Sequence, residues 1–267
     1  MWFFELSTAV LAVILTTIVF GATAVGLLLG RRVRHLSESL REPFGVLQGA
    51  LLGVVGLILA FGLSLAVTRY ENRRAAVVDE ANAIGTTFLR AQTLREPVRS
   101  RSLAHLRDYA DVSIRLTGAI PGSAEAQKAI ADGDLIQQQL WGLGGEALND
   151  APVASAPRLY IETLNEMIDL QTVRIAGLNN RVPGAVLALE IVGAALALGL
   201  LATYLSIVGR GVFAVLIAAG LVVMLLVVTC DLDRPTRGLI QVPSTPLTSL
   251  RAEMALPPAA SAPRPLP

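Results

Sequence analysis

Four long apolar stretches constrain the fold of this chain more than any other feature. A helix that crosses the roughly 30 Å hydrocarbon core of a bilayer needs about 20 consecutive apolar residues. The chain has four such stretches, which cover residues 6–29, 46–67, 184–208 and 211–229. A backbone exposed to lipid must satisfy its own hydrogen bonds, so each stretch is expected to form a helix. The sequence therefore predicts an all-α integral membrane protein with four transmembrane helices.

The first stretch shares one feature with secretory signal peptides, because Ala22, Thr23 and Ala24 look like a cleavage site. A signal peptide carries basic residues ahead of a short apolar run. Glu5 stands at that place here, and the apolar run is longer than a signal needs. We therefore expect an uncleaved membrane helix.

The region between the second and third stretches has the polarity of a soluble domain, and its apolar residues recur at spacings of three and four. This pattern is typical of amphipathic helices. We expect one helix to continue from the second stretch to about Leu94. Further helices are expected over residues 106–116, 123–141 and 161–178, with Ser123 as an N-cap and a loop over 142–157. The sequence thus predicts a helical bundle inserted between the second and third transmembrane helices.

The expected organisation has five parts. They are the first transmembrane helix with a polar loop (1–45), the second transmembrane helix (46–67), the bundle (68–183), the third and fourth transmembrane helices (184–229), and an exit motif with a tail (230–267). Because the tail is rich in proline, we expect it to be disordered apart from a short helix at 247–254.

The composition excludes several classes of function. The net charge is +1 and no basic patch stands out, so no nucleic-acid partner is expected. The single cysteine, Cys230, excludes an internal disulfide and a cysteine metal cluster. His35 and His105 have no partner at metal-ligand spacing, and no Walker, HExxH or GxSxG motif occurs. We expect neither enzymatic activity nor a bound cofactor or metal.

An even number of spans places both termini and the bundle on the same side of the membrane. Cytoplasmic segments carry an excess of arginine and lysine. More arginines flank the membrane on the bundle side, although Arg31, Arg32 and Arg34 in the first loop favour the reverse orientation. We expect a multi-pass protein of the bacterial inner membrane, with the bundle and both termini in the cytoplasm.

One face of the second stretch consists of small residues at spacings of three and four: Gly49, Gly53, Gly56, Ala60 and Ser64. Such faces let membrane helices approach closely. One interpretation is packing against the first or fourth stretch of the same chain. The other is packing around the symmetry axis of an oligomer, in which Leu57, Phe61 and Leu65 line a narrow apolar constriction. Constrictions of this kind gate channels by dewetting.

Glu190 lies about two turns inside the third stretch. A carboxylate within a membrane is costly, so it is a functional candidate by default. A simpler interpretation is that Glu190 snorkels to the interface or pairs with Arg181 or Arg210.

Two other polar clusters have both functional and structural interpretations. Glu80, Asn82 and Gly85 interrupt an apolar helix. Because buried polar groups need partners, we expect Asn82 to bond to a neighbouring helix. Asp231 and Asp233 follow the last stretch and could help to hold a calcium ion. Without a loop of the EF-hand kind, they are more typical of a solvated exit motif that pairs internally.

Six short segments carry a resemblance to a known family. They are residues 61–70 (FGLSLAVTRY), 80–86 (EANAIGT), 164–169 (LNEMID), 180–183 (NRVP), 231–235 (DLDRP) and 237–240 (RGLI). The motif residues in and beside them are Arg69, Glu80, Asn82, Gly85, Asp169, Arg174, Pro183, Asp231, Asp233, Arg234 and Pro235. The first segment resembles the second span of bestrophin anion channels, and the chain as a whole resembles the bacterial bestrophin-like family.

The resemblance implies a homo-oligomer, pentameric in bestrophins, with a cytosolic helical domain and a central pore lined by the second span. Phe61 and Leu57 fall on neck phenylalanine positions of bestrophins. Gly53 falls where bestrophins carry a bulkier apolar residue. The calcium clasp of animal bestrophins is not reproduced, so no calcium gating is expected.

We therefore expect a bestrophin-like ion channel in the lipid bilayer that conducts anions, with a halide as the permeant ion. Its hydrophobic neck is formed by the second transmembrane helices of a homo-oligomer. The alternative is a membrane-anchored sensory or interaction module that uses the bundle to bind a partner protein. A small transporter is disfavoured, because inverted repeats and broken helices are not evident.

Overall fold

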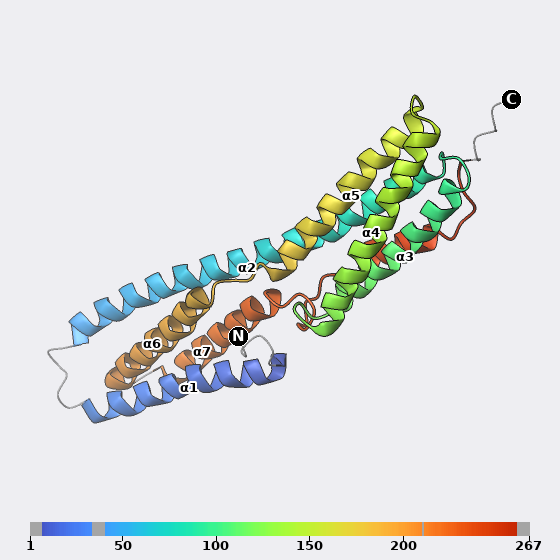
Figure 1. The fold of residues 1–267 in the computed structure, drawn as a ribbon. Helices are drawn as coiled ribbons and strands as arrows, with labels where there is room; N and C mark the ends of the chain where they lie inside the picture. The colour runs from blue at the N-terminus through green and yellow to red at the C-terminus, as the bar shows by residue number, and fades with distance from the viewer. Residues whose placement is uncertain (1–6, 34–40, 210, 261–267) are drawn as a thin grey trace. The chain divides into compact units, whose positions relative to one another are not determined.

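The computed structural model describes residues 7–33, 41–209 and 211–260, and the regular elements in these ranges are all helices (Figure 1). They are α1 (Thr8–Val33), α2 (Arg41–Ala91), α3 (Val98–Gly118), α4 (Ala124–Asp150), α5 (Ser155–Asn179), α6 (Gly184–Val208), α7 (Val212–Leu232) and α8 (Thr245–Glu253). Four helical segments, which contain α1, the first half of α2, α6 and α7, are long and apolar enough to cross a membrane. For the described residues, the predicted all-α fold with four helices able to span a membrane is confirmed.

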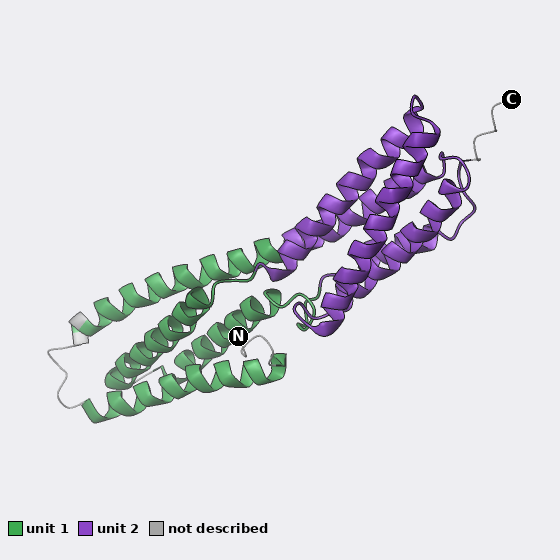
Figure 2. Ribbon diagram, in the orientation of Figure 1, with its two compact units in different colours: residues 1–70, 181–241 green, residues 71–180, 242–267 purple. Residues whose placement is uncertain are grey.

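The chain divides into two compact units (Figure 2). Unit 1 consists of residues 1–70 and 181–241, and it contains α1, the first part of α2, α6 and α7. Unit 2 consists of residues 71–180 and 242–267, and it contains the rest of α2 together with α3, α4, α5 and α8. The membrane-length helices thus lie in unit 1, and the long helix α2 contributes to both units.

Small residues let α1 and α6 lie close together in unit 1. A Cβ atom added to Gly26 of α1 would overlap the backbone carbonyl of Gly199 on α6. Nearby, the hydroxyl of Ser206 donates a hydrogen bond to the carbonyl oxygen of Leu27 at 3.0 Å. Lipid tails are as apolar as the helices, so close backbone approach and interhelical hydrogen bonds hold such pairs together. The α1–α6 pair is therefore a fixed part of the membrane unit.

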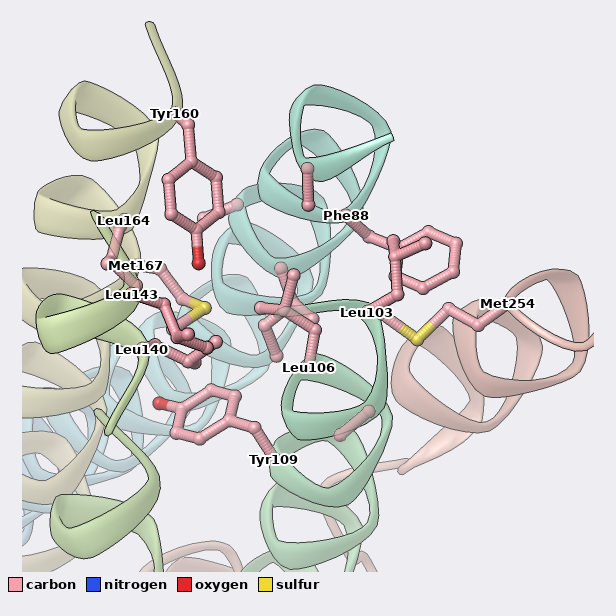
Figure 3. Close-up of a cluster of buried hydrophobic side chains, with 14 of the residues drawn as sticks. Phe88, Leu103, Leu106, Tyr109, Leu140, Leu143, Tyr160, Leu164, Met167 and Met254 are labelled. Carbon is pink, nitrogen blue, oxygen red and sulfur yellow. The ribbon is translucent and has the colours of Figure 1, made fainter. Parts of the chain in front are cut away.

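Unit 2 is a helical bundle whose core lies between α2, α3, α4 and α5 (Figure 3). The fully buried side chains of this core include Ile84, Leu106, Tyr109, Leu140, Tyr160, Leu164 and Met167. At the start of α4, the Ser123 hydroxyl accepts a hydrogen bond from the backbone N–H of Ala126 at 3.2 Å. The predicted N-cap is confirmed, and it satisfies one of the free N–H groups at the helix start.

The loop expected over residues 142–157 is present only over residues 151–154, because α4 continues through its glycines to Asp150 and α5 begins at Ser155. Glycine in a helix interior costs about 1 kcal/mol relative to alanine. Gly144 nevertheless has a tertiary role: a Cβ atom here would lie 2.9 Å from the Cγ1 atom of Ile161 on α5. The glycine allows α4 and α5 to approach each other, and this packing outweighs the weak local propensity.

The short helix expected in the tail is confirmed as α8, but the disorder expected after it is wrong as far as Ala260, whose backbone bonds to the side chains of Gln92 and Arg99. Leu247 of α8 is buried in the core of the bundle, and so is Met254 just after it. Figure 3 shows Met254 beside Leu103. Arg251 pairs with Asp111 of α3 at 2.8 Å. Two apolar side chains and an ion pair thus hold the expected short helix on the bundle.

Candidate functional site

The membrane part of α2 has one face that is buried within unit 1. Val55, Leu59, Gly62 and Ala66 lie on this face at spacings of three and four. A Cβ atom added to Gly193 of α6 would lie 3.4 Å from a methyl group of Val55. The buried face of α2 therefore packs on α6.

The opposite face of α2 is open. Gly49, Gly53, Gly56, Ala60 and Ser64 are all exposed, and a Cβ atom on any of the three glycines would have no neighbour within 4 Å. Packing of this small-residue face against the first or fourth span is therefore wrong for the described residues. No other part of the described chain covers the small-residue face at these glycines.

Two large apolar side chains lie on the same open side of α2. Leu57 is 57% exposed and Phe61 is 66% exposed. Leu65, one turn further, is only half-exposed and packs against the apolar core of unit 1. Of the three candidates for a constriction, Leu57 and Phe61 thus project away from the chain, whereas Leu65 is partly held within it.

Glu190 on α6 is completely buried, with 0% of its surface exposed. Neither carboxylate oxygen has a hydrogen-bond partner among the described residues. Both simpler interpretations are therefore wrong for the described residues, because the side chain neither snorkels to the surface nor pairs with Arg181. Arg210, the other expected partner, lies outside the described residues. The carboxylate contacts α2 at Gly62, where an added Cβ atom would overlap it.

Asp231 closes the loop that follows α7. Its carboxylate accepts hydrogen bonds from the backbone N–H groups of Leu239 at 3.0 Å and Ile240 at 2.9 Å. It also accepts one from the hydroxyl of Thr8, at the start of α1, at 3.2 Å. The side chain is 2% exposed, so the expectation of a solvated motif is wrong, although the carboxylate does bond internally.

Asp233 has a related role in unit 1. This fully buried carboxylate accepts a hydrogen bond from the backbone N–H of Val182 at 3.0 Å, just ahead of α6. The neighbouring Arg234 and Pro235 are buried as well, and Pro183 is exposed at the N-cap of α6. The DLDRP segment thus ties the end of α7 to the starts of α1 and α6.

A buried ion pair between Glu80 of α2 and Arg174 of α5 lies inside unit 2. Arg174 also donates hydrogen bonds to the carbonyl oxygen of Ser113 at 2.9 Å and to the hydroxyl oxygen of Thr117 at 2.6 Å. Glu80 accepts a further bond from the Ser113 hydroxyl at 3.0 Å. Two family-motif residues, far apart in the sequence, are thus brought together with α3.

Tyr109, Gln137 and Gln171 extend this network. The amide of Gln137 donates to the Tyr109 oxygen at 3.1 Å and also bonds to the side-chain oxygen of Gln171. Burial, and then the nearby Glu80 carboxylate, raise the pKa of Tyr109 above its ordinary range, so the phenol stays protonated. The network links α2, α3, α4 and α5 inside the bundle. Gln171 is not among the residues expected from the sequence to have a role, although it lies on the apolar stripe of α5 between Ile168 and Ile175.

The remaining motif residues have no part in this network. Asn82 is exposed, so its expected bond to a neighbouring helix is wrong. Two residues correspond to about 200° around a helix, and Asn82 therefore faces away from the side that buries Glu80. Asp169 is also exposed, and Gly85 lies against Leu250 of α8. Arg69 is half-buried near the end of the membrane part of α2.

Comparison with known proteins gives one family match. The model of the bestrophin-like domain matches residues 8–247 of this chain. None of the curated proteins compared with the chain matches it.

Solved structures share the fold at low sequence identity. The chain is similar to a bacterial bestrophin homologue from Klebsiella pneumoniae, with a TM-score of 0.67 and 13% identity over 88% of this chain and 96% of the other. A single-substitution variant of that homologue gives a TM-score of 0.68 and 14% identity over 90% of this chain and 96% of the other. The likeness covers almost all of the solved chains.

Proposed function

Because the chain belongs to the bestrophin-like family, we propose that it is an anion channel whose pore is lined by α2 in a homo-oligomer. Members of this family are membrane-embedded, oligomeric ion channels. The open face of α2 is the observation that supports the same role for this chain. Leu57 and Phe61 are exposed there beside a face of small residues that nothing else in the described chain covers.

In a symmetric ring of subunits, the open faces of the α2 helices would together form a constriction. In a closed ring, every copy contributes the same side chain at the same height, so each Phe61 would stand opposite the Phe61 side chains of the other copies. The small residues would let neighbouring α2 helices approach closely. A ring of phenylalanines and leucines makes a dry, apolar neck, and ions pass such a neck only when it is wetted. The bestrophin pentamer is the assembly we propose.

The proposed selectivity for halides rests on charge at the ends of the spans. Arg31 and Arg32 lie at the end of α1, and Arg69 lies near the end of the membrane part of α2. Positive groups near the mouth of a pore raise the local concentration of anions. We propose that the chain lies in the bacterial inner membrane with unit 2 and both termini in the cytoplasm.

The test is halide flux through the purified protein in liposomes, with the wild type beside Phe61→Ala. Truncation of the ring widens the neck and makes it easier to wet, so flux is expected to rise. Phe213→Ala is the matched control, because Phe213 on α7 is 77% exposed and has no place in the neck. This variant is expected to conduct like the wild type.

Two results would count against a pore at this place. If neither the wild type nor Phe61→Ala conducts, although both are inserted, a sensory or interaction module becomes the better description. If Phe61→Ala and Phe213→Ala raise the flux equally, the change reflects general loosening of the membrane unit.

A further inference from the structure

Glu190 differs from the other buried carboxylates described above in having no partner. Glu80 is held by Arg174, and Asp231 and Asp233 accept backbone N–H groups. Both oxygens of Glu190 lack a hydrogen bond within the described residues, and the side chain is 0% exposed. A buried ionised carboxylate without a partner is far more costly than a buried neutral carboxylic acid. The site is therefore suited to the protonated form.

The carboxyl group occupies a defined position on α2. It lies against Gly62, and any larger residue there would overlap it. Gly62 is adjacent in sequence to Phe61, whose side chain projects from the open side of the same helix. Glu190 therefore contacts the buried face of α2 at the same helical turn from which Phe61 projects on the open face.

The charged and titratable groups around Glu190 are few. α2 presents Gly62 itself, and its next charged residue along the chain is Arg69. α7 contributes the buried thiol of Cys230. α6 has no other charged residue. The first charged residue of α1 is Arg31, in the last turn of that helix.

The groups beyond Cys230 are already engaged. Asp231 and Asp233 accept backbone hydrogen bonds, and Arg69 and Arg234 also have partners. Among the described residues, no cation therefore pairs with the Glu190 carboxylate.

We propose that Glu190 is a proton-binding site at the contact between α6 and α2, and that its charge state sets how α2 packs at the height of Phe61. When protonated, the neutral carboxyl fits the dry contact with Gly62 seen in the structure. When the proton leaves, the carboxylate needs water, and water enters only if α2 and α6 separate here. The consequence for ion flux rests on the proposed function, whereas proton binding does not.

The first test measures flux in liposomes from acidic to alkaline pH. The wild type is expected to change its flux with pH. Glu190→Gln, which keeps the neutral shape, is expected to lose this dependence and to stay at the level that the wild type reaches at acidic pH. Glu166→Gln, at an exposed carboxylate of α5, is the matched control and is expected to follow the wild type. If Glu190→Gln keeps the pH dependence of the wild type, the proposal is overturned.

The second test needs no ion flux and therefore separates this proposal from the channel itself. Infrared difference spectra of the full chain in lipid, recorded between alkaline and acidic pH, report the carbonyl stretch of a protonated carboxylic acid. A band that appears on acidification in the wild type and in Glu166→Gln, but not in Glu190→Gln, supports the proton site even if no variant conducts. If the wild type shows no such band, or if Glu190→Gln shows the same band as the wild type, the proposal is overturned, whatever the flux measurements show.

Discussion

The carboxylate of Glu80 on α2 is bound by the guanidinium group of Arg174 on α5, although 94 positions separate the two residues in the chain. Both side chains are almost completely shielded from water. Ser113 and Thr117 on α3 accept hydrogen bonds from the same guanidinium group. A buried charge that loses its partner is strongly destabilising, so this pair fixes the register of three helices in unit 2.

Replacement of Arg174 by alanine is therefore expected to destabilise the protein markedly. The remaining Glu80 carboxylate would be buried without its cation, at a cost of about 3–5 kcal/mol in the free energy of unfolding. Denaturant unfolding measures the loss. Arg101→Ala is the control: Arg101 and Glu146 form an ion pair of 2.8 Å, but both side chains are about half-exposed. Exposed pairs contribute roughly 1 kcal/mol or less. Equal losses in the two variants would contradict the special role of the buried pair.

The sequence predicts the membrane helices well because their length is dictated by the bilayer and not by the rest of the protein. The same logic identifies Glu190, since a carboxylate in an apolar stretch stands out without a structure. Its contact with Gly62 is a tertiary relationship between two helices, and no local pattern encodes which glycine it meets.

The errors have a common physical cause, namely that tertiary contacts override local tendencies. The glycines after Trp141 indicate a loop, yet Gly144 makes room for Ile161. The prolines of the tail indicate disorder after its short helix, yet the side chains of Gln92 and Arg99 bond to the backbone of Ala260. In each case the deciding contact is with a residue that is distant in the sequence or on another helix.

Two glycines of α4 are expected to respond in opposite ways to alanine. Alanine has the higher helix propensity, so Gly142→Ala, with open space around its Cβ position, should stabilise the protein by about 0.5–1 kcal/mol. Gly144→Ala should destabilise it, because the new methyl group lies 2.9 Å from Ile161. Thermal unfolding of the two variants beside the wild type checks both signs. Stabilisation by both substitutions would mean that α4 and α5 are not closely packed at this point.

The orientation of unit 2 can be measured with a single cysteine placed at Val153. This residue lies between α4 and α5 and is 95% exposed, so Val153→Cys should react readily with a maleimide that cannot cross membranes. With unit 2 in the cytoplasm, labelling is expected only after intact cells are permeabilised. The wild type is the control, because Cys230 is 1% exposed and should remain unlabelled. Labelling of intact cells would place unit 2 outside and favour a sensory module.

Unit 2 is expected to lose stability in strong alkali. Burial raises the pKa of Tyr160 from 10.0 to about 12, so the folded chain keeps a phenol proton that the unfolded chain gives up. The stabilising contribution is complete below pH 10 and is lost as the pH rises from 10 through 12. Between pH 10 and 12, the free energy of unfolding measured with denaturant should fall less for Tyr160→Phe than for the wild type. Tyr70→Phe, at a partly buried residue of unit 1, is the control and should leave the loss unchanged.

The small face of α2 provides the sharpest test of assembly. Gly56 is exposed and has no neighbour within 4 Å, so leucine at this position should leave the fold of one chain intact. If α2 helices meet through this face around a symmetry axis, the leucine side chain would hold them apart, and Gly56→Leu should lower the oligomeric mass in native mass spectrometry. Gly21→Leu is the matched control, because Gly21 on α1 is also exposed and has no neighbour within 4 Å. If Gly56→Leu lowers the mass and Gly21→Leu does not, the contact between subunits is formed by α2, the helix that carries Phe61. An unchanged mass for both variants would mean that α2 does not form the contact between subunits, and the proposed neck would lose its structural basis.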